Sequence, residues 1–234
     1  MIAVFLDFNG LPGSGKTTLS LRLVQALQNA GTPALLFQEY IDRHIKSNLD
    51  SLKVFFGGLV RMSPARFWVF VRFCGSLPRE APRRIYRCYL LMLNYILYRN
   101  CAKENGTAVI VSEQCVIQEV LSCYYSQPIP KDRNSVLPVL KLLGEDYCAV
   151  NVKLSTASVI QRLKGRKNGE SRLDAMCDET GIEAILRVQE LNLSYIRDCM
   201  RSAGIRGTEI STEDPPEENV SRIMERLNLG GSGK

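Results

Sequence analysis

The sequence predicts an α/β fold, in which a five-stranded parallel sheet is covered by helices on both faces. Five short, apolar, strand-like segments recur along the 234 residues, at positions 2–8, 34–37, 108–111, 148–154 and 207–210. Segments with the 3.6-residue period of helices separate them, which is typical of parallel strands joined by helical crossovers. A glycine-rich turn between the first strand and the first helix is the third observation. Together they predict a three-layer α/β/α architecture.

The glycine-rich turn completes the pattern G-x-x-x-x-G-K-T from Gly10 to Thr17. It follows a strand-like run and opens a helix-period segment at 17–29, which is where phosphate-binding loops occur. Backbone N–H groups and the helix dipole favour an anion at such a helix start. Lys16 is expected to reach the β and γ phosphate oxygens of a nucleoside triphosphate, and the Thr17 hydroxyl to hold Mg²⁺. The predicted loop contacts are Gly10, Pro12, Gly13, Ser14, Gly15, Lys16, Thr17 and Thr18.

Composition restricts the partners and the compartment. The net charge of +6 suits small anionic molecules, and no base-stacking or groove-reading module accompanies it, so we expect no nucleic acid partner. The longest apolar run, at 88–98, is far shorter than the roughly 20 residues of a membrane span. Eight cysteines occur without C-x-x-C pairs, which favours a reducing, cytoplasmic compartment. The sequence leaves a homodimer open.

The longest connection joins the second and third strands. In doubly wound sheets, ligands bind beyond the carboxyl ends of the strands, so this connection is placed to cover a second substrate. We predict a single domain over residues 1–229, with a helical acceptor-side region at 39–105, a lid at 156–180 and a flexible tail at 230–234. Within the acceptor-side region, Gly57-Gly58 and Ser63-Pro64 are expected to interrupt the helices.

The segment 55–73 is rich in aromatic residues, including Trp68, and arginines interrupt it at Arg61, Arg66 and Arg72. Interpreted as a helix it is amphipathic, and the simplest expectation is a helix packed on the core with solvated arginines. Peripheral contact with a membrane surface, or a pocket for an apolar acceptor, is the alternative.

Other motifs resemble the thymidylate kinase and deoxynucleoside kinase group of P-loop kinases. Residues 8–16 are similar to the F-E-G-L-D-G-x-G-K of thymidylate kinases, with Asn9 and Pro12 as departures. Residues 109–115 resemble the family strand that ends in D-R-Y or E-R-S. There, Glu113 matches the acidic position and Gln114 replaces the arginine. The resemblance implies a P-loop NTPase fold with a helical insertion after the second strand, and ATP and Mg²⁺ as cofactors.

The resemblance also implies roles for individual residues. Glu113 would bind the metal together with Thr17, although an acid in the first turn of a helix is also expected simply to cap it. Glu39 would take the proton of a hydroxyl acceptor; otherwise it is a loop carboxylate or a partner of Arg43. The positions that match acceptor contacts are Glu39, Arg87, Gln114 and Glu119.

A basic segment resembles the family lid. Arg162 and Arg166 match its R-x-x-x-R pattern, and 171–174 resembles the downstream D-R-x-E. Two arginines four positions apart share a helix face, where they could grip one polyphosphate and stabilise its transfer. A solvated basic face is the alternative. Both arginines are predicted to be catalytic, and Arg162 is also predicted to bind the nucleotide.

Three functions remain open at this level. The first is an ATP- and Mg²⁺-dependent kinase that acts on a nucleoside or a nucleoside monophosphate, as in thymidylate kinases. The second is a kinase with a sugar, an antibiotic or a lipid-like alcohol as acceptor. The third is a nucleotide-dependent regulatory protein with weak or no catalysis, which the substitution at Gln114 would suit.

Overall fold

The sheet has five strands, and every neighbouring pair is parallel, in the order β2-β3-β1-β4-β5. The computed structural model describes residues 3–77, 84–106, 108–130, 135–164 and 179–228. The strands are β1 (Val4–Gly10), β2 (Ala34–Leu36), β3 (Val109–Ser112), β4 (Tyr147–Lys153) and β5 (Arg206–Ser211). All five overlap the segments predicted from the sequence, because continuous apolar runs suit strands that are buried on both faces.

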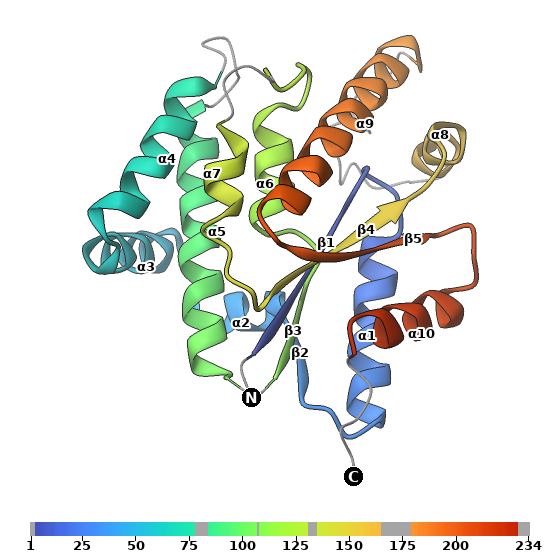
Figure 1. The fold of residues 1–234 in the computed structure, drawn as a ribbon, viewed down its shortest axis with the longest axis horizontal. Coiled ribbons are helices and arrows are strands. Elements are labelled where there is room, and N and C mark those ends of the chain that lie inside the picture. Colours follow the sequence, from blue (N-terminus) through green and yellow to red (C-terminus); the bar gives the residue numbers. More distant parts are fainter. Residues whose placement is uncertain (1–2, 78–83, 107, 131–134, 165–178, 229–234) are drawn as a thin grey trace.

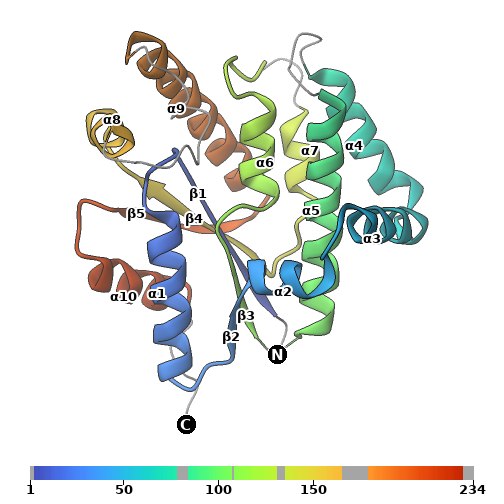
Figure 2. The same ribbon diagram turned by 180° about the vertical axis from the view of Figure 1, so that it is seen from behind.

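Ten helices surround the sheet in the described residues. They are α1 (Lys16–Asn29), α2 (Phe37–His44), α3 (Asn48–Arg61), α4 (Pro64–Ser76), α5 (Arg84–Glu104), α6 (Val116–Cys123), α7 (Val136–Leu140), α8 (Thr156–Lys164), α9 (Glu179–Ser202) and α10 (Pro216–Arg226). Helices α1 and α10 lie on one side of the sheet, and α4 to α7 with α9 lie on the other (Figures 1 and 2). This arrangement confirms the predicted three-layer fold.

Two hydrophobic cores hold the layers together. Side chains alternate along β1, so Phe5 enters the core beneath α5 and α6, and Leu6 and Phe8 enter the core beneath α1 and α10. Phe5 stacks on Tyr147 of β4, with ring centroids 5.2 Å apart. Because β1, β3 and β4 are parallel neighbours, their carboxyl ends meet at one edge of the sheet. The glycine-rich loop after β1 therefore lies beside the segment that follows β3.

The helices α2 to α5 occupy most of the predicted acceptor-side region. The predicted break at Ser63-Pro64 is confirmed, because α3 ends before it and α4 begins at Pro64. The Ser63 hydroxyl caps α4 by accepting a hydrogen bond from the Arg66 backbone N–H. The predicted break at Gly57-Gly58 is wrong, because α3 continues through both glycines. A Cβ at Gly58 would lie 2.4 Å from Cγ2 of Ile96 on α5. Glycine is present there because the two helices approach closely.

No helix in the described part of the chain is both long enough and apolar enough to cross a membrane. Two features predicted from the sequence lie outside the described residues: positions 165–178 of the lid, which include Arg166, and the tail at 230–234.

Candidate active site

The loop between β1 and α1 has the backbone that a phosphate cradle needs. Gly10 and Gly15 have φ angles of 155° and 88°, which side chains with a Cβ rarely adopt. A Cβ on Gly10 would also lie 2.5 Å from the Val152 carbonyl oxygen of β4. The loop can therefore turn sharply against the sheet, and its N–H groups open at the start of α1.

Two polar side chains in the loop suit an anion. The Lys16 ammonium group donates hydrogen bonds of 3.0 Å to the carbonyl oxygens of Gly10 and Leu11, so the cation is held inside the curve of the loop. The Ser14 hydroxyl is buried and has no hydrogen-bond partner among the described residues. A buried polar group of this kind normally has a partner. The loop thus fits the phosphates of ATP, with Pro12 and Gly13 half-buried at its turn and Thr18 exposed on α1.

The predicted metal-binding residues lie together. Thr17 begins α1 and Glu113 follows β3; the Thr17 hydroxyl donates a 2.5 Å hydrogen bond to Oε2 of Glu113. The hydroxyl of Ser20 donates to the other carboxylate oxygen, at 3.2 Å. Mg²⁺ prefers oxygen ligands and is commonly held by one or two protein groups together with substrate phosphates. The pair therefore fits a magnesium ion beside the phosphate loop.

Arg162 reaches the same loop from α8. Its guanidinium donates to the Gly13 carbonyl at 3.4 Å and to the Thr212 carbonyl at 3.1 Å. These contacts join α8, the glycine-rich loop and the segment after β5. The described residues thus bring Arg162 to the predicted phosphate loop.

Arg87 and Glu119, two of the predicted acceptor residues, interact with each other. Arg87 Nη1 on α5 lies 3.5 Å from Oε2 of Glu119 on α6, and the two side chains are 17% and 11% exposed. Burial raises the pKa of Glu119, and the Arg87 charge opposes that shift. The pair stands between two helices, and its charges compensate one another. Sequence reasoning had placed both on the acceptor.

A cavity of about 250 Å³ adjoins Glu113, the predicted metal ligand. Gln38 of α2, Glu113 and Gln114 line it, at the carboxyl ends of β2 and β3. Glu39, the predicted base, is exposed in the first turn of α2 and is not part of this lining. The residue before it, Gln38, takes that place, because consecutive helical residues point about 100° apart.

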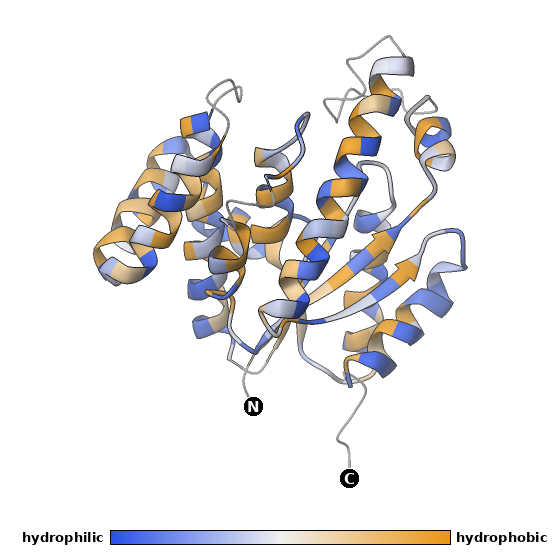
Figure 3. Cartoon of the chain, turned by 45° about the horizontal axis from the view of Figure 1, so that its top comes forward, coloured by the Kyte–Doolittle hydropathy of each residue, from blue (hydrophilic) through white to orange (hydrophobic). Residues whose placement is uncertain are grey.

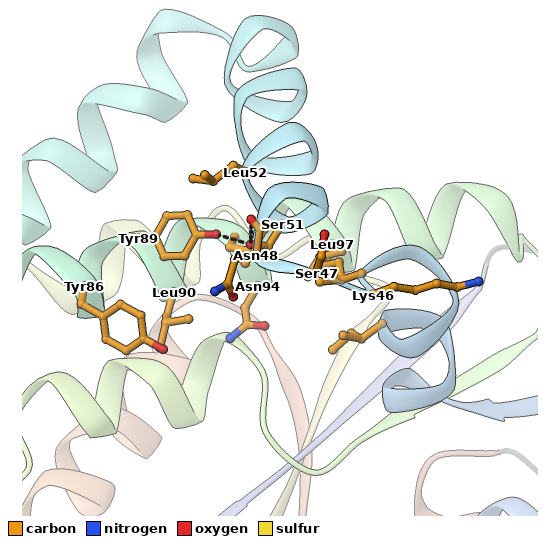
Figure 4. A pocket seen from close by; sticks show the side chains of 13 residues that line it. Lys46, Ser47, Asn48, Ser51, Leu52, Tyr86, Tyr89, Leu90, Asn94 and Leu97 are labelled. Carbon is orange, nitrogen blue, oxygen red and sulfur yellow. Dashed lines mark hydrogen bonds between the residues drawn. The ribbon is translucent and has the colours of Figure 1, made fainter.

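A larger cavity of about 730 Å³ lies between α2, α3 and α5. Figure 4 shows the amides of Asn48 and Asn94 close to each other, with the rings of Tyr86 and Tyr89 on the α5 side. Lys46 is the one charged residue in this lining, which contains no acid. The Asn94 carbonyl accepts a hydrogen bond from the Cys115 thiol at 3.9 Å, so one end of the cavity lies near the segment that carries Glu113.

Sequence reasoning missed a buried carboxyl group beneath the site. Asp7 of β1 is fully buried, and the Tyr147 hydroxyl donates a 2.5 Å hydrogen bond to it. The Ile117 backbone N–H at the start of α6 donates to the same oxygen, at 3.3 Å. Burial raises the pKa of Asp7 to about 7, and these hydrogen bonds oppose the shift. An isolated acid within an apolar strand was the signal that could have revealed it.

Comparison with solved structures finds proteins of similar fold. No protein-family model matches the sequence, and no curated protein matches it significantly. The solved structure of shikimate kinase from Acinetobacter baumannii in complex with shikimate aligns with 99% of this chain and 96% of its own. The identity is 14% and the TM-score is 0.48. A likeness at this level does not define a substrate.

Proposed function

We propose that this protein transfers the terminal phosphoryl group of ATP to a hydroxyl group of a small molecule. The observation that supports it best is the hydrogen bond between Thr17 and Glu113, beside Lys16. A phosphate loop alone indicates nucleotide binding. A carboxylate from another strand, held against the threonine of that loop, adds the oxygen ligands that a catalytic magnesium ion uses.

The residues of the site have separate roles in phosphoryl transfer. ATP supplies the phosphoryl group, and Mg²⁺ neutralises charge on its phosphates. The loop amides and Lys16 bind the phosphate oxygens, while Thr17 and Glu113 orient the metal. Arg162, which already bonds the Gly13 carbonyl, is placed to stabilise charge on the group in transfer. Such transfer depends on positioning and electrostatics rather than on a covalent intermediate.

The acceptor side favours a neutral molecule with hydroxyl groups. Amides and hydroxyls line both cavities, and the cation expected to hold an acceptor phosphate, Arg87, is paired with Glu119. A nucleoside fits this description and follows the resemblance seen in the sequence. The phosphate group of a nucleoside monophosphate would need a cation other than Arg87. Lys46 is the one charged residue that lines the larger cavity. Sugars and other polar alcohols are the alternative acceptors.

The test is ADP release with a panel of nucleosides, nucleoside monophosphates and sugars, compared with release without an acceptor. We expect a hydroxyl acceptor to stimulate turnover, and Glu113→Gln to lower kcat by about 10²-fold or more, the size typical of lost transition-state charge stabilisation. Glu145→Gln, at an exposed carboxylate away from the site, is the matched control. ATP binding without stimulation by any acceptor would contradict a kinase and favour a regulatory protein.

A further inference from the structure

Helix α3 exposes an apolar stripe on the outside of the molecule. Leu49, Leu52, Phe56 and Val60 recur at helical spacing and are all exposed, Val60 to 88%. The adjacent positions Phe55 and Leu59 pack partly against the core. None of the residues of α3 is fully buried. Soluble proteins seldom leave such a stripe in water without a partner.

Helix α4 extends the apolar surface. Phe67 is 42% exposed and Trp68 is 61% exposed, in the turn that follows Ser63. Figure 3 shows α3 and α4 together at one edge of the molecule, with hydrophobic positions on both helices. We call the exposed apolar residues of these two helices the α3–α4 face.

The α3–α4 face is surrounded by positive charge. From residue 51 to residue 78 the sequence contains four cations, Lys53, Arg61, Arg66 and Arg72, and no acid. Within the described part of the chain, none of the three arginines forms an ion pair. Their charges are therefore available to an anionic partner, and two copies of this face would repel each other.

Three arginines meet at a small pocket where α3 joins α4. Arg61, Arg66 and Arg99 line a cavity of about 90 Å³, together with Tyr95. The Tyr95 side chain is only 2% exposed, and its hydroxyl has no hydrogen-bond partner among the described residues. Burial raises the pKa of Tyr95, and the charges of Arg66 and Arg99 oppose that shift. Convergent guanidinium groups and a free hydroxyl donor are what a phosphate group requires.

The volume of this pocket restricts its ligand. Small-molecule sites usually measure roughly 300–1,000 Å³, so 90 Å³ accommodates one charged group and not a whole nucleotide. The rest of the ligand must lie outside the pocket, on the exposed surface of α3 and α4. A molecule with a phosphate at one end and hydrocarbon beside it is a phospholipid in a bilayer.

We propose that the α3–α4 face docks on an anionic lipid bilayer, with a lipid phosphate in the pocket of Arg61, Arg66 and Arg99. Phe56, Val60 and Trp68 enter the interfacial layer, where aromatic side chains are favoured, and the arginines remain at the level of the headgroups. A nucleic acid would satisfy the arginines but would leave the apolar stripe in water. The mixture of apolar and cationic residues therefore favours the membrane.

Trp68 reports on this docking directly, because it is the one tryptophan in the sequence. Trp68 emission and co-sedimentation are measured for the full chain with phosphatidylcholine vesicles, alone and with phosphatidylglycerol added. We expect a blue shift and sedimentation with the anionic vesicles, and quenching by lipids brominated in the upper acyl chain. Equal binding to neutral vesicles, or no binding to either, would overturn the proposal.

Paired variants separate the two parts of the face. The double variant Arg61→Gln/Arg66→Gln should bind anionic vesicles roughly 25-fold more weakly. Each of the two arginines is expected to contribute the usual effect of one cation near a charged surface. Phe56→Ser with Val60→Ser should remove the blue shift. Controls on α9, Arg187→Gln and Leu191→Ser, change an exposed cation and an exposed apolar residue outside the face and should bind normally.

Three further outcomes would contradict the membrane as partner. A blue shift that grows with protein concentration in the absence of vesicles would indicate self-association. A response to single-stranded RNA equal to that with vesicles would indicate a nucleic acid. If inorganic phosphate binds at the three arginines and does not reduce vesicle binding, the pocket is an anion site that is separate from the membrane contact. Circular dichroism of each variant shows whether it is folded before binding is compared.

Discussion

Arg87 of α5 and Glu119 of α6 form an ion pair across 3.5 Å, almost out of contact with water. Sequence reasoning assigned both residues to the acceptor, and the structure shows that they pair with each other. The pair joins α5 to α6 close to the segment that carries Glu113, so its first effect is on the shape of the acceptor side.

Loss of one partner of this pair should destabilise the fold. In Arg87→Ala, the Glu119 carboxylate stays buried without its cation, which should lower the free energy of unfolding by about 3 kcal/mol. Replacement of both residues, by Arg87→Met and Glu119→Gln, should recover most of that loss. Urea denaturation of Arg87→Met, Glu119→Gln and the double variant measures the coupling. Unchanged stability of Arg87→Ala, with weaker acceptor binding, would instead assign Arg87 to the acceptor.

Removal of the Arg162 guanidinium should affect turnover more than folding. The side chain is exposed and contacts the glycine-rich loop, so Arg162→Ala should lower kcat about 10³-fold while the protein remains folded. Arg162→Lys keeps the charge and loses the planar fork, so it should recover only part of the rate. Arg187→Ala is a control on an exposed arginine of α9. Near-normal turnover of Arg162→Ala would remove it from the mechanism.

Substitutions at the neighbouring residues Gln38 and Glu39 should affect the kinetics differently. Because Glu39 is exposed and lies outside the cavity lining, Glu39→Gln should change kcat by no more than about twofold. Gln38→Ala removes an amide from the wall beside Glu113 and should raise the acceptor KM roughly three- to tenfold. Steady-state kinetics with the acceptor identified by the panel measures both. A 10²-fold loss of kcat in Glu39→Gln would support Glu39 as the base.

Asp7 should make stability depend on pH. Its pKa rises from an ordinary 3.8 to about 7 on folding, so the native state binds more protons than the unfolded chain between these values. The free energy of unfolding should therefore fall as pH rises from 4 to 7, by up to about 4 kcal/mol. Asp7→Asn cannot ionise, so its stability should fall less steeply over that range. Urea denaturation at several pH values measures both slopes.

The comparison with Asp7→Asn isolates this residue from other titrating groups. The groups that face Asp7 are Tyr147 on β4, Cys115 before α6 and Lys16 on α1, and each is present in both proteins. Glu119, whose pKa is also raised, adds the same slope to both. Equal slopes for the natural protein and Asp7→Asn would show that Asp7 stays charged in the folded state.

Adjacent glycines in α3 should respond in opposite directions. A Cβ at Gly58 would press on Ile96, so Gly58→Ala should cost about 1–3 kcal/mol of unfolding free energy. A Cβ at Gly57 meets nothing within 4 Å, so Gly57→Ala should add about 0.5–1 kcal/mol through its better helix propensity. Thermal denaturation of the two variants gives the comparison. Destabilisation of both by the same amount would mean that α3 does not pack on α5 at Gly58.

The phosphate loop and the sheet could be predicted from the sequence because their signals are local. Gly10 and Gly15 adopt positive φ angles, and this requirement involves only the few residues of the loop. Continuous apolar runs indicate strands of a parallel sheet that is covered on both faces. The resemblance to the kinase group implied that Thr17 and Glu113 act together. Their apposition has a simple cause, because β1 and β3 are parallel neighbours and end at one edge of the sheet. Both residues were predicted metal ligands, and they lie in hydrogen-bond contact.

The contacts of helical side chains could not be predicted in the same way. Gln38 and Glu39 are consecutive, and only the packing of α2 decides which one faces the cavity. The sequence of α3 contains apolar residues on two faces, and the approach of Gly58 to Ile96 decides that Phe56 and Val60 remain outside. Asp7 meets Tyr147 across 140 residues of sequence.

The sequence by itself determined the α/β class, the phosphate loop and the chemistry of the residues around it. Tertiary structure decided which charges compensate one another, as in Arg87 with Glu119, and which apolar face of α3 stays in water. The physical reason is the range of the interactions. Backbone conformation and strand burial depend on near neighbours and on composition, whereas the direction of a helical side chain depends on elements that are distant in the chain.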